Sequence, residues 1–485
     1  MTTKAEHNIL VISDLHLGED LRPGVANVSY LRHLVKLERE LEAFLTHYAT
    51  NRKDGRPWTL VVNGDMVDFM SIMLQPAAHD EVDADDDEQL YGLGFGERQS
   101  QKKLERVIVR HQGVFGKLAE FVAAGNELVI VVGNHDPEFQ YPSVQRTLVE
   151  WLCGLAVGAG ASSEARDAFS RRISFCPWFY YRQDLIYVEH GHQYDEYCSF
   201  DYVLHPVASR ARGGRKSAVA LSIAHAGMRY FANQLPDSYD PRTAEHWSTW
   251  DYARWGVAQG LRGLVRLSYL YGILVWRVVE IWYWLRHADA ERRAVHHERL
   301  RALSTEWQIA EDKLIALDAL KRSPVTRRLW GLLSTLFIDR MLLGAVAVGI
   351  ATVTAVHLPG AWRIVAPVGT MLTFAVVNQI LNRVRLEPSS VKLRSSTRLI
   401  QGLVCAPFIV FGHSHAPEAV QLSSGATYFN TGTWASDDPN LSFTHVIVTR
   451  SDDGAGSPRG ELRQWRDGGS QPFAAPARTT KKAAG

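Results

Sequence analysis

Cysteine is scarce in this chain: it occurs four times among 485 residues, and never as a Cys-x-x-Cys pair. This spacing gives no disulfide framework and no thiolate zinc site, and it favours a reducing compartment. An excess of charge is also missing, because 53 Lys and Arg residues balance 52 Asp and Glu residues. Nucleic-acid-binding proteins need a basic surface, so the charge gives no support for that function.

The basic-then-apolar layout of a signal peptide is also missing from the first residues. Met1–Asn8 is polar, and the apolar run Ile9–Ile12 that follows is too short for a signal peptide. We therefore expect the N-terminus to lie in the cytosol. The hydrophobic content of 46% allows a large core. The length suits one large domain with insertions, or roughly two to three ordinary domains.

Several short apolar runs have the length and composition of strands, and each ends in a polar cluster. These are Ile9–Ile12 before Asp14 and His16, Thr59–Val62 before Asp65, Glu127–Val132 before Asn134 and His135, Leu185–Val188 before His190, and Cys405–Phe411 before His413 and His415. Side chains two residues apart on a strand point the same way. Open α/β sheets place their sites at the carboxyl ends of strands, so we expect these clusters to meet.

The collected side chains offer carboxylate and amide oxygens and imidazoles, without a thiolate. Such a set suits Mn, Fe or Zn, and it is large enough for two ions that share one carboxylate. Two ions about 3.5–4 Å apart can bind a bridging hydroxide and clamp the oxygens of an in-line phosphoryl displacement. Each cluster alone could be a solvated loop, but their common position after strands argues against coincidence.

The order Asp-x-His, Gly-Asp, Gly-Asn-His-Asp, a single His and Gly-His-x-His resembles the calcineurin-like metallophosphoesterases, over about residues 8–195 and 400–450. The resemblance implies an α/β fold, a four-layer α/β/β/α sandwich. It implies hydrolysis of a phosphomonoester, phosphodiester or pyrophosphate bond by a metal-bridging hydroxide. It also implies one ion held by Asp14, His16, Asp65 and His415, and a second held by Asp65, Asn134, His190 and His413.

The resemblance further implies that His135 faces the substrate, where it stabilises transition-state oxyanions or protonates the leaving group. In some members it pairs with an Asp at the position of Asp68, and such a carboxylate favours the protonated imidazole. His192 has no family-wide role and is a candidate for substrate contact. The spellings Ser13–Leu17 and Glu189–His192 look closest to the UDP-2,3-diacylglucosamine pyrophosphohydrolases, which act on lipids at the bilayer surface. This chain departs from them because it has His135 where they usually carry Arg, and because it is much longer.

Residues 196–400 separate the two parts of the resemblance and read as a helical insertion. Within it, Met341–Leu358 and Ile364–Leu381 each contain 18 residues without a formal charge, joined by a short connection. A helix of 18 residues spans roughly 27 Å, close to a ~30 Å hydrocarbon core. Lys and Arg flank both outer ends, which predicts that both face the cytoplasm. A hairpin buried in a soluble insertion is the alternative.

Trp247–His287 is rich in Trp and Tyr, with Arg inside its apolar run. This composition is typical of a helix at the membrane interface, or of one packed in a soluble bundle. The clusters on either side of the insertion must meet, so the chain crosses the membrane an even number of times, and we expect this stretch to lie at the interface. We expect loops at Asp80–Glu88 and Ser209–Ser217, and one helical stretch at Glu97–Ala123.

We therefore expect a phosphoesterase domain in residues 1–195 and 401–450, a helical insertion in residues 196–400 with membrane helices at 341–358 and 364–381, and a disordered tail in residues 451–485. The expected function is metal-dependent hydrolysis of a phosphorylated small molecule or lipid with two divalent ions, at a membrane, with the catalytic domain facing the cytoplasm. Nucleic acid is not an expected partner. The alternatives are a nuclease or cyclic-nucleotide phosphodiesterase of the same superfamily, and a non-catalytic membrane scaffold.

Overall fold

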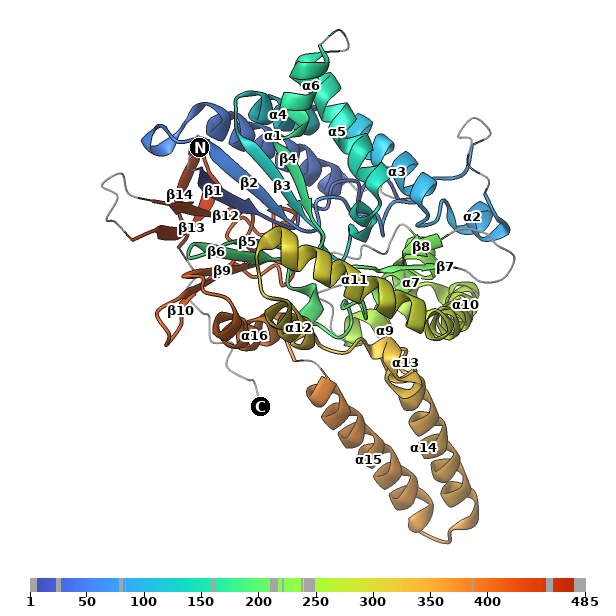
Figure 1. Cartoon of the computed structure of the whole chain (residues 1–485). Helices are drawn as coiled ribbons and strands as arrows, with labels where there is room; N and C mark the ends of the chain where they lie inside the picture. The colour runs from blue at the N-terminus through green and yellow to red at the C-terminus, as the bar shows by residue number, and fades with distance from the viewer. Residues whose placement is uncertain are drawn as a thin grey trace.

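The structure is a computed structural model in which two β-sheets lie between layers of helices (Figure 1). It describes residues 7–22, 28–77, 82, 84–158, 160, 162–209, 217–219, 222–236, 239, 249–385, 387–450 and 457–474. Most of the loop predicted at Ser209–Ser217 lies outside these residues.

The first sheet has seven strands in the order β14-β13-β12-β1-β2-β3-β4. Strands β1 to β4 run parallel, and β12, β13 and β14 continue the sheet beyond β1 with antiparallel pairings. The strands are β1 (Asn8–Ile12), β2 (Trp58–Asn63), β3 (Glu127–Val131), β4 (Ile173–Cys176), β12 (Thr444–Thr449), β13 (Arg459–Arg466) and β14 (Gly469–Pro472).

The second sheet has five strands in the order β10-β11-β9-β6-β5. Strands β6, β9 and β11 run parallel, with antiparallel strands at both edges. The strands are β5 (Phe179–Arg182), β6 (Ile186–Glu189), β9 (Phe408–Phe411), β10 (Glu418–Gln421) and β11 (Thr427–Asn430). A short pair, β7 (Val207–Ser209) and β8 (Ser217–Val219), forms a separate sheet. Strands β6 and β9 are therefore neighbours although the insertion separates them in sequence.

Alternation along β1 explains how the sheets stack. Ile9 and Val11 belong to the core between the two sheets, which also includes Val410. Leu10 and Ile12 point to the opposite face and belong to the core between the first sheet and the helices that cover its outer face. Successive side chains of a strand point to opposite faces, so a strand covered on both sides needs a continuous apolar run. The run of β1 meets that need.

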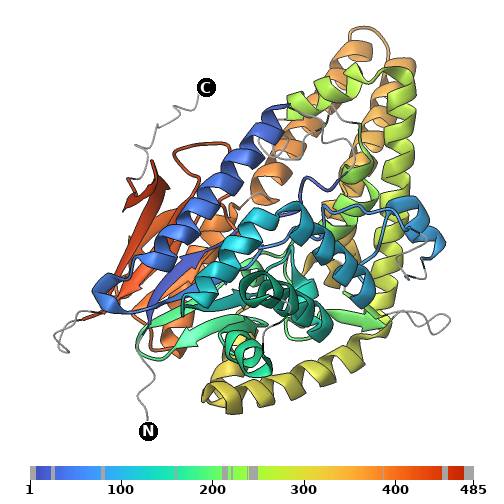
Figure 2. The ribbon, with the colours of Figure 1, turned by 90° about the horizontal axis from the view of Figure 1, so that it is seen from above.

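The outer face of the first sheet is covered by helices from the N-terminal part of the chain, and Figure 2 looks down on this layer. They are α1 (Val28–Thr50), α3 (Glu97–Arg110), α4 (Gln112–Ala123) and α5 (Pro142–Val157), and α6 (Ser163–Ser170) follows. The helical stretch predicted at Glu97–Ala123 forms as two helices, because His111 leaves the helical conformation with φ −110° and ψ 35°.

The outer layer on the second sheet comes from the insertion. It consists of α11 (Asp289–Trp307), α12 (Glu311–Ala319) and α16 (Ser389–Leu403). Leu300, Leu317 and Ile400 share a core with Ile409 of β9. Burying each such side chain contributes roughly 1.5–3 kcal/mol. The predicted four-layer α/β/β/α sandwich is confirmed. The insertion predicted at residues 196–400 supplies helices that share a core with the second sheet, so it is not a separate unit from the phosphoesterase domain.

The rest of the insertion forms a helical group and a hairpin. The group contains α7 (Ile223–Tyr230), α9 (Thr249–Ala258), α10 (Gly260–His287) and α13 (Leu329–Thr335). Helix α10 buries Leu274 and Val278 against α7 and α13, and Leu270 is buried as well. Helices α14 (Ile338–His357) and α15 (Trp362–Arg385) form a hairpin that projects from the molecule (Figure 1). Both are long and apolar enough to cross a membrane by length and composition, and only 11% and 0% of these spans are buried.

The prediction of a disordered tail is wrong for residues 459–472, which form β13 and β14. Strand β13 pairs with β12, so that Leu462 lies opposite Val446. Leu462 and Trp465 are both buried, and the Trp465 indole donates a hydrogen bond to Glu40 Oε2 at 3.2 Å. These contacts fix the strand at the edge of the sheet, and the domain predicted to end at residue 450 continues to Pro472.

The prediction of a solvated loop at Asp80–Glu88 is also wrong at its C-terminal end, where α2 (Asp86–Tyr91) begins. Asp85 caps this helix by accepting a hydrogen bond from the backbone of Glu88. Asp87 pairs with Arg229 of α7 at 3.1 Å and with Arg277 of α10 at 2.7 Å. The acidic run therefore attaches the insertion to the part of the chain that precedes it.

Candidate metal centre

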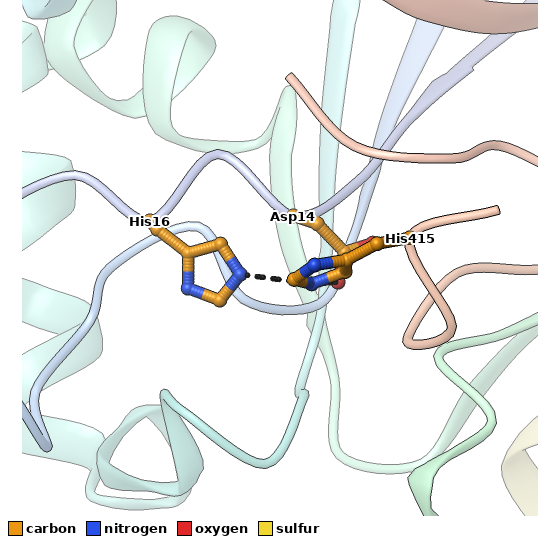
Figure 3. A group of neighbouring side chains, drawn as sticks. All are labelled: Asp14, His16 and His415. Atoms are coloured by element: carbon orange, nitrogen blue, oxygen red, sulfur yellow. Dashed lines mark hydrogen bonds and ion pairs between the residues drawn. The ribbon is translucent and has the colours of Figure 1, made fainter. Parts of the chain in front are cut away.

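The turns after β1, β2, β3, β6 and β9 meet at one edge of the sandwich. Because the carboxyl ends of neighbouring parallel strands lie together, the pairing of β6 with β9 brings the last two histidines to the others. In Figure 3, His415 reaches Asp14 and His16, which follow β1. The structure brings together all the ligands that the sequence predicts, namely Asp14, His16, Asp65, Asn134, His190, His413 and His415.

The first group of donors is formed by Asp14, His16 and His415. His415 Nε2 lies 3.2 Å from Asp14 Oδ1 and 3.3 Å from His16 Nε2. Asp14 is fully buried, and no hydrogen bond to its Oδ1 is found among the described residues. Two imidazole nitrogens and a carboxylate oxygen thus converge on one small volume, as donors to a shared ion do.

The second group is formed by Asp65, Asn134 and His190. His190 Nε2 lies 3.1 Å from Asp65 Oδ2 and 3.1 Å from Asn134 Oδ1. Its Nδ1 donates a hydrogen bond to the carbonyl oxygen of Asn63 at 2.8 Å. A histidine that donates one ring N–H to a backbone carbonyl presents its other nitrogen as a ligand. The ring centre of His413 is 5.4 Å from that of His190.

The charges of this centre favour a cation. Among the described residues, neither Asp14 nor Asp65 forms an ion pair with Lys or Arg. Burial would lower the pKa of His190, but the carboxylates of Asp65 and Asp14 raise it to about 10. The same attraction is available to a divalent ion, and oxygen and imidazole donors suit Mn, Fe or Zn. The donor set therefore fits the metals that the sequence predicts, without selecting one.

Backbone conformation aims these donors. Asp14, His16, Asp65 and His413 all have left-handed backbone conformations, with φ of 55°, 49°, 54° and 64°. Such conformations cost about 1–3 kcal/mol each for residues other than glycine, and they cluster at functional sites. A Cβ on Gly133 would lie 2.2 Å from Asp65 Oδ1, so only glycine lets the two turns approach this closely.

His135 lies at the edge of the centre and faces a groove. Its Nδ1 is 2.9 Å from Asp68 Oδ1, and its Nε2 is 4.0 Å from Asp65 Oδ2. Ser71 fixes Asp68 by donating from Oγ at 2.6 Å. Burial would lower the pKa of His135, but Asp65 and Asp68 raise it to about 9. With its side chain 24% exposed, His135 can offer a proton to a molecule in the groove.

Asp136 joins two of the turns. Its carboxylate accepts hydrogen bonds from the backbone N–H groups of Met66 and Gly133, both at 2.7 Å. Burial, together with the charge of Asp65, raises the pKa of Asp136 to about 7. Met66 and Gly133 are direct neighbours of predicted ligands, so this carboxylate holds the turns after β2 and β3 in register.

The groove beside the centre has a volume of about 2010 Å³. His16, Asp65 and His135 line one part of it, and Met228 of α7 and Arg394 of α16 line another. The insertion therefore supplies walls of the groove. Amphipathic periodicity shows which face of a helix is buried, but it does not show which site the helix borders.

Two further polar residues lie next to the predicted ligands. His192 is 3% exposed, its ring centre is 5.5 Å from that of His190, and it does not line the groove. Its predicted substrate contact stays a prediction. Asp195 was missed, although its Oδ2 lies 3.6 Å from His413 Nε2. Asp195 and Cys198 could join His413 in a further metal-binding group. In the sequence, Asp195 is one acid in a polar stretch, without a motif to mark it.

The comparisons with known proteins agree with this geometry. Residues 7–206 match the calcineurin-like phosphoesterase family. No curated protein and no solved structure matched the chain. The phosphoesterase match supports a metal-dependent phosphoesterase activity. It ends before His413 and His415, which reach the phosphoesterase region through the pairing of β6 with β9.

Proposed function

We propose that this chain is a dinuclear metal-dependent phosphoesterase. The observation that carries the proposal is the convergence of oxygen and imidazole donors around the carboxylate of Asp65, within and beside the matched phosphoesterase region. When bound, two divalent ions supply charge stabilisation at the phosphoryl oxygens and activate a water molecule. One position would be held by Asp14, His16, Asp65 and His415, and the other by Asp65, Asn134, His190 and His413.

In the proposed reaction, His135 acts on the substrate from the groove. Its bond to Asp68 fixes the ring, so that Nε2 is the free donor. The carboxylate of Asp68, 2.9 Å from Nδ1, favours the protonated ring, so His135 can donate the proton on Nε2 to the leaving oxygen. Asp68 acts through His135 and is a positioning residue.

The test is the activity of the detergent-extracted chain on bis-p-nitrophenyl phosphate, a phosphomonoester, cyclic nucleotides, a pyrophosphate and single-stranded DNA, with and without Mn²⁺. We expect metal-dependent turnover that His135→Ala lowers by about 10²–10⁴-fold. His297→Ala, on the exposed side of α11, is the matched control and keeps full activity. Full activity of His135→Ala would contradict the proposed role. Preference for DNA or cyclic nucleotides would support the nuclease or cyclic-nucleotide alternative.

The proposal includes a membrane anchor formed by α14 and α15. Hydrophobic side chains cover the outside of both helices, among them Val353 at 58% exposed and Leu372 at 62%. A contiguous apolar surface of this kind is unfavourable in water and suits lipid. The buried hairpin considered as the alternative does not agree with this exposure. At the root of the hairpin, Arg340 donates a hydrogen bond to Asn378 Oδ1 at 2.9 Å, which ties the two helices together.

Helix α10 would lie on the membrane surface. The face opposite its buried residues exposes a stripe of apolar and aromatic side chains. These are Leu261, Val265, Tyr269, Trp276 and Tyr283, between 50% and 79% exposed. Tyr and Trp favour the headgroup region, and Figure 2 shows α10 (light green) along one side of the molecule. The stripe supports the interfacial placement.

The catalytic domain would face the cytoplasm, because basic residues flank both outer ends of the hairpin. Ala361→Cys places a thiol at the exposed tip of the hairpin, and Cys405 offers an exposed thiol in the connection between α16 and β9. In sealed, cytoplasm-inside vesicles, an impermeant maleimide should label the tip and spare Cys405. Labelling of both from the same side would contradict a spanning hairpin.

The anchor and the likeness to UDP-2,3-diacylglucosamine pyrophosphohydrolases together favour a membrane-associated phosphodiester or pyrophosphate as the substrate. A groove of about 2010 Å³ has room for a substrate larger than a simple phosphomonoester. A strong preference for a water-soluble phosphomonoester over lipid-linked pyrophosphates would contradict this part of the proposal, and it would leave the metal chemistry standing.

A further inference from the structure

The segment Gln193–Cys198, just after the turn that carries His190, touches both ends of the chain that forms the hairpin. On the N-terminal side, the backbone N–H of Arg322 donates to the carbonyl of Gln193 at 2.9 Å. The N–H of Val325 donates to the carbonyl of Glu196, also at 2.9 Å. Arg322 and Val325 lie between α12 and α13, shortly before the hairpin begins.

On the C-terminal side, the first turn of α16 contacts the same segment. Ser389 Oγ donates to Asp195 Oδ2 at 2.6 Å. Lys392 Nζ lies 3.2 Å from Asp195 Oδ1 and 2.9 Å from Glu196 Oε2. The Lys392 side chain is only 2% exposed, so water screens these contacts little. Helix α16 directly follows α15. The residues that precede the hairpin and those that follow it, here called its roots, therefore both contact the segment Gln193–Cys198.

Asp195 connects this segment to the metal centre. Its Oδ2, which accepts the Ser389 hydrogen bond, lies 3.6 Å from His413 Nε2. His413 Nε2 is buried and has no hydrogen-bond partner among the described residues. From its other side, the backbone N–H of His413 donates to Asp14 Oδ2 at 3.2 Å. A carboxylate that faces the outer nitrogen of a metal-binding imidazole fixes the ring orientation and raises its basicity.

We propose that Asp195 is a positioning residue for His413, held in place by Ser389 and Lys392, so that the roots of the hairpin set the geometry of one metal position. This inference rests on the proposed function, because it takes His413 as a ligand. It adds a mechanical link between a membrane anchor and the metal centre.

The test measures Mn²⁺ binding to the full-length chain in detergent by isothermal titration calorimetry, with turnover recorded separately. Asp195→Asn keeps the size of the side chain but removes its charge. We expect it to weaken one of two Mn²⁺ sites by about 10–100-fold and to leave the other unchanged. Ser389→Ala removes one hydrogen bond to Asp195 and should weaken the same site by about 2–10-fold. Ser390→Ala is the matched control: Ser390 lines the same groove beside Ser389, and this variant should bind Mn²⁺ as the wild type does.

Wild-type affinity at both sites in a folded Asp195→Asn variant would overturn the inference. Complete loss of one ion at saturating Mn²⁺ would also overturn it, because Asp195 would then be a ligand itself. If Asp195→Asn does not fold, Ser389→Ala decides, since it removes only a hydroxyl group. A wild-type chain that binds two ions but hydrolyses no phosphoester would contradict the proposed function and leave this binding test intact.

Discussion

Replacing Gly64 with alanine should damage both the metal centre and the stability of the fold. Gly64 has φ +77° in the turn before Asp65, and its Cα faces the His190 ring. A Cβ there would lie 2.4 Å from His190 Nδ1 and 2.8 Å from His190 Cβ. The ring cannot turn away easily, because His190 is fully buried and its Nδ1 is bonded to Asn63.

Two costs add up in this variant. A left-handed conformation costs about 1–2 kcal/mol for a residue with a Cβ. Overpacking against a buried ring costs about 1–3 kcal/mol more, because either the ring or the backbone of the turn must move. The free energy of unfolding should therefore fall by about 2–5 kcal/mol. Displacing His190 and Asp65 should also weaken metal binding.

The assay is thermal unfolding in detergent, followed by circular dichroism, together with the metal content of the purified chain. Gly116→Ala is the matched control, because Gly116 lies in α4 with open space around its missing Cβ. There alanine should stabilise by about 0.5–1 kcal/mol. A Gly64→Ala variant with wild-type melting and metal content would refute the argument that only glycine fits at this turn.

Three further predictions concern other contacts. Asp68→Asn should keep the metal content but slow turnover by about 10²–10⁴-fold, since it loosens His135; unchanged turnover would contradict the positioning role. Arg229→Met should lower the free energy of unfolding by about 1–3 kcal/mol in denaturant titrations, because Asp87 keeps Arg277 but loses Arg229, and the carbonyls of Gly92 and Leu93 lose their donor. Against burial, Asp20 and His111 shift each other's pKa, that of His111 upwards and that of Asp20 downwards. The stability that this pair contributes is lost at low pH, as the Asp20 carboxylate becomes protonated below the ordinary Asp pKa of 3.8. It is also lost at high pH, as His111 loses its proton through its raised pKa. His111→Gln should therefore destabilise the fold most between about pH 4 and 6.5. An equal loss of stability at pH 9 would contradict this pair.

The predicted ligands could be found from the sequence because each lies within four residues of the carboxyl end of a strand. Once Ile9–Ile12 is recognised as a strand, Asp14 and His16 must leave its carboxyl end, and parallel neighbours bring their own turns to the same edge. The position of His413 needed only the assumption that the last strand joins the same sandwich. In these cases, local pattern and sheet topology lead to the same answer.

The missed features depend on contacts between distant segments. Asp195 has no motif, and its partners Ser389 and Lys392 lie on the far side of the insertion. Strand β13 was not predicted because the Gly, Ser and Pro residues before it are typical of disorder. Trp465 was the contrary signal, since Trp is unusual in a disordered tail. Helices α11, α12 and α16, which cover the second sheet, were predicted as part of a separate insertion, because amphipathic periodicity does not show which sheet a helix covers.

The central claim is that the strand-end donors hold two metal ions. Elemental analysis of the purified full-length chain tests it most directly, with Asp65→Ala beside the wild type. The predicted result is two divalent ions per wild-type chain, and a marked loss from Asp65→Ala in a protein that still folds, because Asp65 is the carboxylate proposed to be shared. A wild-type chain that binds no divalent ion after Mn²⁺ is supplied, or an Asp65→Ala chain with full metal content, would contradict the dinuclear centre.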